Sequence, residues 1–482
     1  MSAMRPAIFR HPACCPASRT LRAGVASCAL GLATVLGGGC ASYVDRMAPV
    51  KADLRAGNVG TALAHLEERF EGTHDDLVYL MERGLLLRQT GQLDESNLVF
   101  ERAEQLAEDL YTKSVSLNVA SLFTSDAVLP YEGEDFERIL LNYFKALNYL
   151  DLGQLEGALV ECRKAQRKLQ FYEERFEGSG DKKYRTDPFV HYLMGLIQES
   201  AGELNDAYVS FKKATRGFQE EGTVLGVSLP PQLADELVTV AERLSFHDER
   251  DDVQRQFPGA HYRPPPGRGC GEAVVLVEVG FVPVKRDVSL SIPILESEKD
   301  ESSVTLAGKL RDRAHERRSW SRVHYWLKLA VPSYDPPAAA PWTTVEVGGA
   351  TASLVENLDA LARASLEDRM PRVLLKAIAR ALAKYLTTTK SEDAVAKKHG
   401  DSAGSAVAAI LNLAALASEQ ADLRAWLGLP REIHMARIVL PAGHHEVAVR
   451  LRGPGGGILG YETVAVDIRE GHTAFVSHRF FL

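Results

Sequence analysis

Residue types that perform chemistry occur throughout this sequence, but few of them have the spacing of a known catalytic or ligand-binding motif. The sequence has no phosphate-binding loop of the form G-x-x-x-x-G-K-[ST], no H-E-x-x-H helix and no closely spaced cysteine pair after residue 40. His444 and His445 are adjacent, and adjacent side chains of a strand point to opposite faces, so we expect no shared metal ion. The segment GPGGGILG lies between two predicted strands, which is typical of a hairpin loop. We therefore predict a non-enzymatic chain without cofactor or metal.

The side chain with the clearest predicted chemistry is the thiol of Cys40. Residues 1–39 contain four arginines and no Asp, Glu or Lys, and an apolar run at 23–36 follows the arginines, as in a secretory signal peptide. That run is well short of the ~20 residues that cross a bilayer. Leu36 and three glycines precede Cys40, which resembles the lipobox of bacterial lipoproteins. We predict cleavage before Cys40 and lipid attachment, palmitate included, to its thiol; a free cysteine after ordinary cleavage is the alternative.

Charge and cysteine content restrict the possible partners. The whole chain has a formal net charge of −8, and removal of the four arginines with residues 1–39 gives −8 − 4 = −12. An acidic surface disfavours nucleic acid, because phosphate binding needs a basic face. Cys162 and Cys270 are the cysteines that remain besides Cys40, so no disulfide framework is expected. We favour a buried thiol at Cys162, although a single bridge to Cys270 stays open.

A repeated sequence pattern between residues 40 and 255 predicts an array of helix pairs. Four segments end one helix with a glycine and open the next with small residues, and the first two glycines are 34 residues apart, the tetratricopeptide period. A small residue follows each glycine by five positions and a packing residue follows four later. A generic helical bundle is the alternative. The predicted turn and packing residues are Gly57, Ala62, Gly84, Gly91, Phe100, Ala103, Gly153, Ala158, Ala165, Gly195, Gly202, Ala207, Phe211 and Ala214.

Tetratricopeptide repeats stack into a curved solenoid whose concave face commonly holds a peptide or a protein. The first helix of each pair would line that face. The candidate partner-binding residues are Arg88, Tyr143, Tyr192 and Glu199. A tyrosine at helical spacing also packs in a core, and the set lacks the clustered basic and amide side chains that would hold a peptide carboxylate, so we name no peptide class.

The second half has a different periodicity. A Pro/Gly-rich linker at 256–271 precedes a β-rich region at 272–350, a helical insertion at 351–425 and a β-rich region at 426–482. Pro371 predicts a kink or a new helix start, and the apolar stretch 405–417 predicts a buried helix. The fold class is therefore multidomain α + β, with a tetratricopeptide-like α-solenoid followed by a β-sandwich-like domain that carries a helical insertion. Two separate small domains are the alternative.

Several segments together carry a resemblance to a known group. These are the lipobox, the repeats, PYEGEDFERILLNYFKALNYL, GEAVVLVEVGFVPVK, VPSY and DLRAWLGLP. This combination resembles an uncharacterised family of bacterial tetratricopeptide lipoproteins and covers nearly the whole mature chain. The resemblance implies no established activity, and the family looks similar to envelope lipoproteins that include regulators of peptidoglycan synthases.

These observations lead to a functional expectation. The absence of aspartate after Cys40 resembles the outer-membrane sorting pattern, so we expect a lipid anchor in the outer membrane, facing the periplasm of a Gram-negative bacterium. We expect a scaffold or adaptor that binds unknown envelope proteins and no nucleic acid. The alternative is a peptidoglycan-binding, glycan-binding or enzymatic module in the β-rich half.

Overall fold

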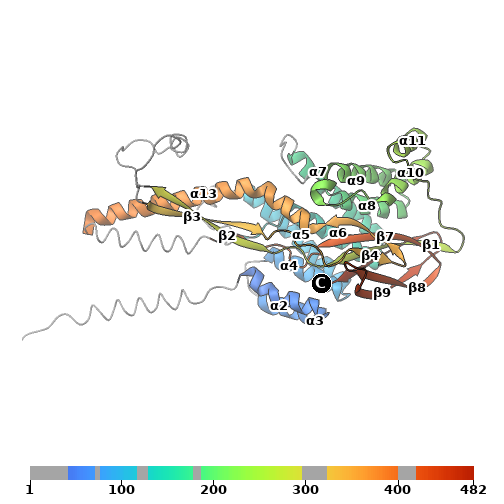
Figure 1. Cartoon of the computed structure of the whole chain (residues 1–482), viewed down its shortest axis with the longest axis horizontal. Helices are drawn as coiled ribbons and strands as arrows, with labels where there is room; N and C mark the ends of the chain where they lie inside the picture. The colour runs from blue at the N-terminus through green and yellow to red at the C-terminus, as the bar shows by residue number, and fades with distance from the viewer. Residues whose placement is uncertain (1–41, 71–75, 117–128, 177–185, 296–322, 400–419) are drawn as a thin grey trace, which may run out of the picture.

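The computed structural model describes residues 42–70, 76–116, 129–176, 186–295, 323–399 and 420–482. Helices occupy the first half and strands dominate the second (Figure 1). The predicted α + β division is thereby confirmed. The predicted signal peptide, Cys40 and the apolar stretch 405–417 lie outside the described residues.

The helical half is an array of helix pairs in which each helix packs against the next (Figure 1). Four pairs coincide with the four predicted segments, and a fifth pair follows them. The helices are α2 Tyr43–Arg55, α3 Val59–Phe70, α4 Asp76–Gln89, α5 Leu93–Ser116, α6 Asp135–Asp151, α7 Leu155–Phe176, α8 Pro188–Ser200, α9 Leu204–Leu225, α10 Pro231–Arg243 and α11 His247–Gln256.

The turn within each of the four predicted pairs has one geometry. Gly57, Gly91, Gly153 and Gly202 have φ angles between 70° and 79°, a region that glycine reaches without a steric penalty. Each glycine donates its N–H to the carbonyl three residues back, and the next residue donates to the carbonyl five back. This pattern terminates a helix and satisfies its last carbonyl groups. The glycines therefore set the angle at which each pair closes.

The fifth pair, α10 and α11, has the same turn without a glycine. Ser245 takes its place with φ 61°. The Ser245 N–H donates to Glu242 O and the Phe246 N–H donates to Ala241 O, at 3.0 and 2.8 Å. Because a search for glycine turns passes over a serine, the sequence prediction of four repeats missed this pair.

The strands of the described segments form two four-stranded sheets and a separate hairpin. The first sheet has the order β10-β1-β7-β6, with β1 parallel to β10 and antiparallel to β7. The second sheet has the order β5-β4-β8-β9, and β2 pairs with β3 in the hairpin. The strands are β1 Cys270–Val279, β2 Lys285–Leu295, β3 Val323–Tyr334, β4 Thr344–Val347, β5 Ala350–Thr351, β6 Ser353–Asn357, β7 Glu432–Pro441, β8 Gly443–Arg452, β9 Ile458–Ile468 and β10 Thr473–Phe480.

The first sheet is the middle layer of three. Alternate residues of β1 face opposite ways: Val275 and Val277 pack against the second sheet, whereas Val274 and Leu276 belong to the core that the helices share. This placement explains why residues 273–277 of β1 are all apolar rather than alternating with polar residues. The helical array and the β-rich half therefore share one core.

A long arm extends from this body to the left in Figure 1. It consists of α13, Leu358–His399, and the β2–β3 hairpin, and Leu329 on β3 packs against Ala377 and Ala381 of α13. Pro371 lies inside α13, which runs on as one helix, so the predicted new start is wrong. The predicted helical insertion at 351–425 also contains β6, because residues 353–357 pair with β7.

Candidate functional site on the inner face of the repeats

The structure places the predicted partner-binding residues against the first sheet. Arg88 on α4 donates to Ser477 Oγ on β10 at 2.6 Å and to Asn148 Oδ1 on α6 at 2.6 Å. The Tyr143 hydroxyl on α6 donates to Glu278 Oε1 on β1 at 3.0 Å. Both residues are buried. Burial and the neighbouring Glu278 carboxylate raise the pKa of Tyr143 well above its usual value, so the hydroxyl remains a donor.

Farther along the array, Glu199 on α8 takes part in a buried ion cluster. Arg437 on β7 lies 2.8 Å from Glu199 and 2.8 Å from Glu236 on α10, and it also pairs with Glu272 on β1. Tyr192 is fully buried on the same helix as Glu199. Burial and then the Glu236 charge raise the pKa of the Tyr192 hydroxyl well above its usual value.

These contacts follow one order along the whole inner face. The helices α4, α6, α8 and α10 contact β10, β1, β7 and β6 respectively, and this is the order of strands in the sheet. The contact between α10 and β6 is the hydrogen bond between Gln232 and Ser353, at 3.0 Å. The prediction that Arg88, Tyr143 and Glu199 are presented to a separate partner is therefore wrong for this structure, because the chain's own sheet occupies their surface. Tyr192 is buried beside Phe211 of α9.

The predicted packing residues lie between the helices of each pair. A Cβ atom on Gly84 would come within 2.5 Å of the Phe100 ring, and one on Gly195 within 2.4 Å of the Phe211 ring. Glycine at these two positions lets the aromatic ring lie directly on the helix backbone. The alanines at the other packing positions are all buried: Ala62, Ala103, Ala158, Ala165, Ala207 and Ala214.

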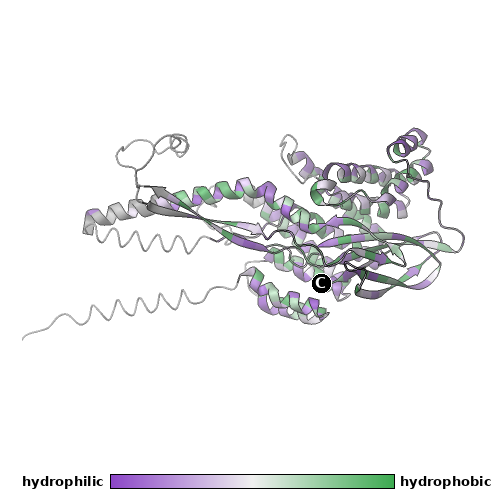
Figure 2. Cartoon of the chain, viewed as in Figure 1, coloured by the Kyte–Doolittle hydropathy of each residue, from purple (hydrophilic) through white to green (hydrophobic). Residues whose placement is uncertain are grey.

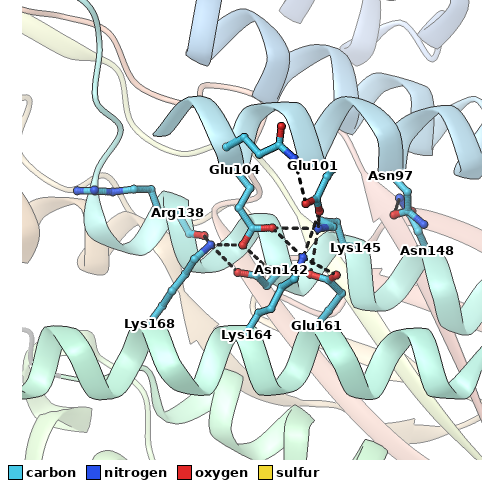
Figure 3. Close-up of polar contacts among 11 residues, drawn as sticks. Asn97, Glu101, Glu104, Arg138, Asn142, Lys145, Asn148, Glu161, Lys164 and Lys168 are labelled. Carbon is cyan, nitrogen blue, oxygen red and sulfur yellow. Dashed lines mark hydrogen bonds and ion pairs between the residues drawn. The ribbon is translucent and has the colours of Figure 1, made fainter. Parts of the chain in front are cut away.

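A cluster of lysines and glutamates joins α5, α6 and α7 (Figure 3). Lys145 on α6 is 1% exposed and bonds Glu101 and, at 3.0 Å, Glu104, both on α5. It also lies 3.2 Å from Glu161 on α7. Lys164 on α7 lies 3.3 Å from both Glu104 and Glu161. The cluster links the second helix pair to the third across a gap in the repeat period.

The remaining lysine of this cluster, Lys168 on α7, pairs with Glu104 and donates to Asn142 Oδ1 at 2.8 Å (Figure 3). Burial alone would raise the pKa of Glu104, but the charges of Lys168 and Lys145 lower it well below its usual value. The pKa of Lys168 is lowered because burial outweighs its attraction to Glu104. Three cations balance three carboxylates, so the cluster has no surplus charge for an ionic ligand.

The segment DLRAWLGLP, residues 422–430, fills the junction between these helices. Trp426 is fully buried, with its ring centroid 5.8 Å from that of Phe100 and 5.4 Å from that of Phe144. Its backbone N–H donates to Glu137 at 2.7 Å, and the Gly428 N–H donates to Glu82 at 3.1 Å. Two segments that carried the family resemblance, PYEGEDFERILLNYFKALNYL and DLRAWLGLP, therefore bind each other.

Glu134, which precedes α6, connects the arm to this junction. Its carboxylate lies 2.8 Å from Lys285 at the start of β2 and 2.9 Å from Arg369 on α13. Burial would raise the pKa of Glu134, but the charges of Arg369 and Lys285 lower it to about 2. A carboxylate that is ionised and doubly paired in this way anchors both parts of the arm on one helix terminus.

The described residues do not bring together a set of metal ligands. No group of three or more His, Cys, Asp or Glu among them could hold a metal ion. The sequence does contain GDSAG at 400–404, the G-x-S-x-G spacing of a nucleophile turn, and it lies outside the described residues. That motif acts on a turn from a strand into a helix, whereas the residues before it belong to α13.

Two further features are the state of the described cysteines and the length and apolarity of the described helices. Cys162 and Cys270 are free thiols, and burial raises the pKa of Cys162 to about 12. No described helix has the length and apolarity needed to cross a bilayer.

Comparison with known proteins gives only remote structural likeness. No protein-family model and no curated protein matches the chain. A MamA structure from Desulfovibrio magneticus RS-1 is 16% identical and covers 46% of this chain and 93% of its own, with a TM-score of 0.27. PilF of Pseudomonas aeruginosa is 13% identical and covers 50% of this chain and 88% of its own, with a TM-score of 0.29. The assignment of tetratricopeptide-like repeats to this chain rests on its own helix pairs and turns.

Proposed function

We propose that this chain is a lipid-anchored envelope lipoprotein, held in the outer membrane and facing the periplasm, that serves as a non-enzymatic scaffold for envelope proteins. The observation that carries the scaffold part is the occupied inner face. Arg88, Tyr143 and Glu199 bind the first sheet. Glu134 binds both parts of the arm, so the repeats hold the sheets and the arm together. Partners would then bind the outer surfaces, where the sandwich and the arm are exposed.

The anchor rests on Cys40 and its preceding residues. In fractionation at high salt, which weakens contacts between charged groups and headgroups, we expect Cys40→Ser to move the protein from the membrane fraction to the soluble fraction. Its circular dichroism and thermal midpoint should stay unchanged. The matched control is Cys270→Ser, which changes a half-buried thiol far from the signal and should leave the protein in the membrane fraction. Unchanged membrane association of the Cys40 variant would overturn the anchor.

The scaffold role is tested by locking the sheet onto the repeats. Cysteines at Gln232 and Ser353, joined by a short bis-maleimide in a Cys270→Ser background, would fix α10 to β6. A photoreactive residue at the exposed position Tyr461 on β9 would then capture the neighbouring protein in the envelope. We expect the same captured protein with and without the lock. Capture that disappears on locking would mean that partners need an open inner face, and capture of none would contradict the scaffold.

A further inference from the structure

The arm has the opposite charge to the rest of the chain. Residues 369–399 of α13 contain eight Lys or Arg and two Asp or Glu, a net charge of +6, whereas the whole chain has −8. Part of this charge is neutralised in the body, since Arg369 pairs with Glu134. Arg372 and Lys376 are ion-paired with no residue in the described part of the chain.

Exposed apolar side chains occur on both parts of the arm. Leu375, between Arg372 and Lys376 in sequence, is 68% exposed. On the hairpin, Val288, Leu290 and Ile292 occupy alternate positions of β2 and are 41%, 44% and 46% exposed. Figure 2 shows hydrophobic and hydrophilic residues interleaved along the visible face of α13. Apolar residues flanked by basic ones are typical of helices that lie in the interface of a bilayer.

The start of the body limits its distance from a membrane. Helix α2 is capped by Ser42, only two residues after Cys40. Two residues span at most about 7 Å, so a body anchored at Cys40 has some of its surface at the bilayer. An acidic body is repelled there by anionic headgroups, and a basic arm is attracted.

We propose that the arm binds the surface of a bilayer that contains anionic phospholipid, with Arg372 and Lys376 at the phosphate headgroups and Leu375 in the interface. This inference deepens the proposed anchoring, and its test uses a chain without lipid so that the two can fail separately. The contact is peripheral: cations bind the headgroups and a few apolar side chains enter the outermost acyl region.

The test is flotation of the mature Cys40→Ser chain with vesicles of phosphatidylcholine, with and without 30% phosphatidylglycerol. We expect binding to the anionic vesicles alone, weakened by salt. Arg372→Glu with Lys376→Glu should weaken the partition at least about 10-fold, because two cations become anions near the surface. The matched control reverses Arg216 and Arg255, which are 78% and 76% exposed on α9 and α11, and should leave the partition unchanged.

A second measurement follows the arm itself. An environment-sensitive dye at Leu375→Cys should shift to the blue with anionic vesicles, whereas the same dye at Tyr461→Cys on the sandwich should not. Equal binding to neutral vesicles, an unchanged partition of the arm variant, or sedimentation with peptidoglycan sacculi in place of vesicles would overturn the proposal. If Cys40→Ser releases the protein in cells while these vesicle experiments fail, the anchor stands without the arm contact.

Discussion

Single charged residues decide how firmly the repeats hold the sheet, and Arg437 is the most connected of them. It pairs with Glu199, Glu236 and Glu272, which come from two helices and a strand. Its removal leaves three buried carboxylates with fewer cations. Deleting one partner of a buried ion pair lowers the free energy of unfolding by about 3 kcal/mol. We expect Arg437→Ala to lower the thermal midpoint of helices and strands together, whereas Arg216→Ala in an exposed pair leaves the midpoint unchanged.

Glu82 is expected to make the stability of the fold depend on pH. Burial raises its pKa from 4.5 to about 7, although the Tyr43 hydroxyl, the Gly428 N–H and the Lys51 charge act in the opposite direction. Because this pKa is higher in the folded than in the unfolded chain, protonated Glu82 contributes its full stabilisation below about pH 4.5. The contribution is lost as the pH rises through the folded-state pKa of about 7. The loss is on the order of 3 kcal/mol.

The measurement is the thermal midpoint between pH 5 and pH 8 for the wild-type protein and for Glu82→Gln. We expect the midpoint of the wild type to fall more steeply across that range, because glutamine has no proton to lose. Parallel curves for the two proteins would show that Glu82 does not titrate there.

The two helices of a pair approach each other closely at a glycine, and adding one methyl group there tests this packing. Gly195→Ala would place a Cβ atom 2.4 Å from the Phe211 ring, so the ring or the helix must move, at a cost of ~1–3 kcal/mol. The matched control is Gly60→Ala in α3, where nothing lies within 4 Å and alanine gains up to ~1 kcal/mol of helix propensity. Circular dichroism melts that shift in the same direction for both variants would contradict the packing.

Features encoded by local sequence could be predicted at this scale. Gly57, Gly91, Gly153 and Gly202 end helices because their positive φ depends on neighbours within five residues. The Ser245 turn was missed because serine, unlike glycine, does not indicate a positive φ angle. The inner face was misassigned for a different reason. Arg88 and Ser477 are 389 residues apart, and nothing near Arg88 in the sequence indicates that a strand lies against it.

At the scale of the molecule, the repeats wrap the first sheet in strand order, and the DLRAWLGLP segment closes the junction between the second and third pairs. The inner face of the repeats is filled by the chain's own sheet, so in this structure it is not an open clamp. The second sheet and the arm lie outside this interface between the repeats and the first sheet (Figure 1).

The most direct test of this arrangement is crosslinking within the native protein. In a Cys270→Ser background, a short bis-maleimide should join cysteines at Gln232 and Ser353 rapidly and almost completely, because these residues are hydrogen-bonded across the interface between repeats and sheet. The mismatched pair of cysteines at Gln232 and Tyr461 should remain unjoined. Crosslinking of the 232–353 pair no faster than the mismatched pair would contradict the occupied inner face.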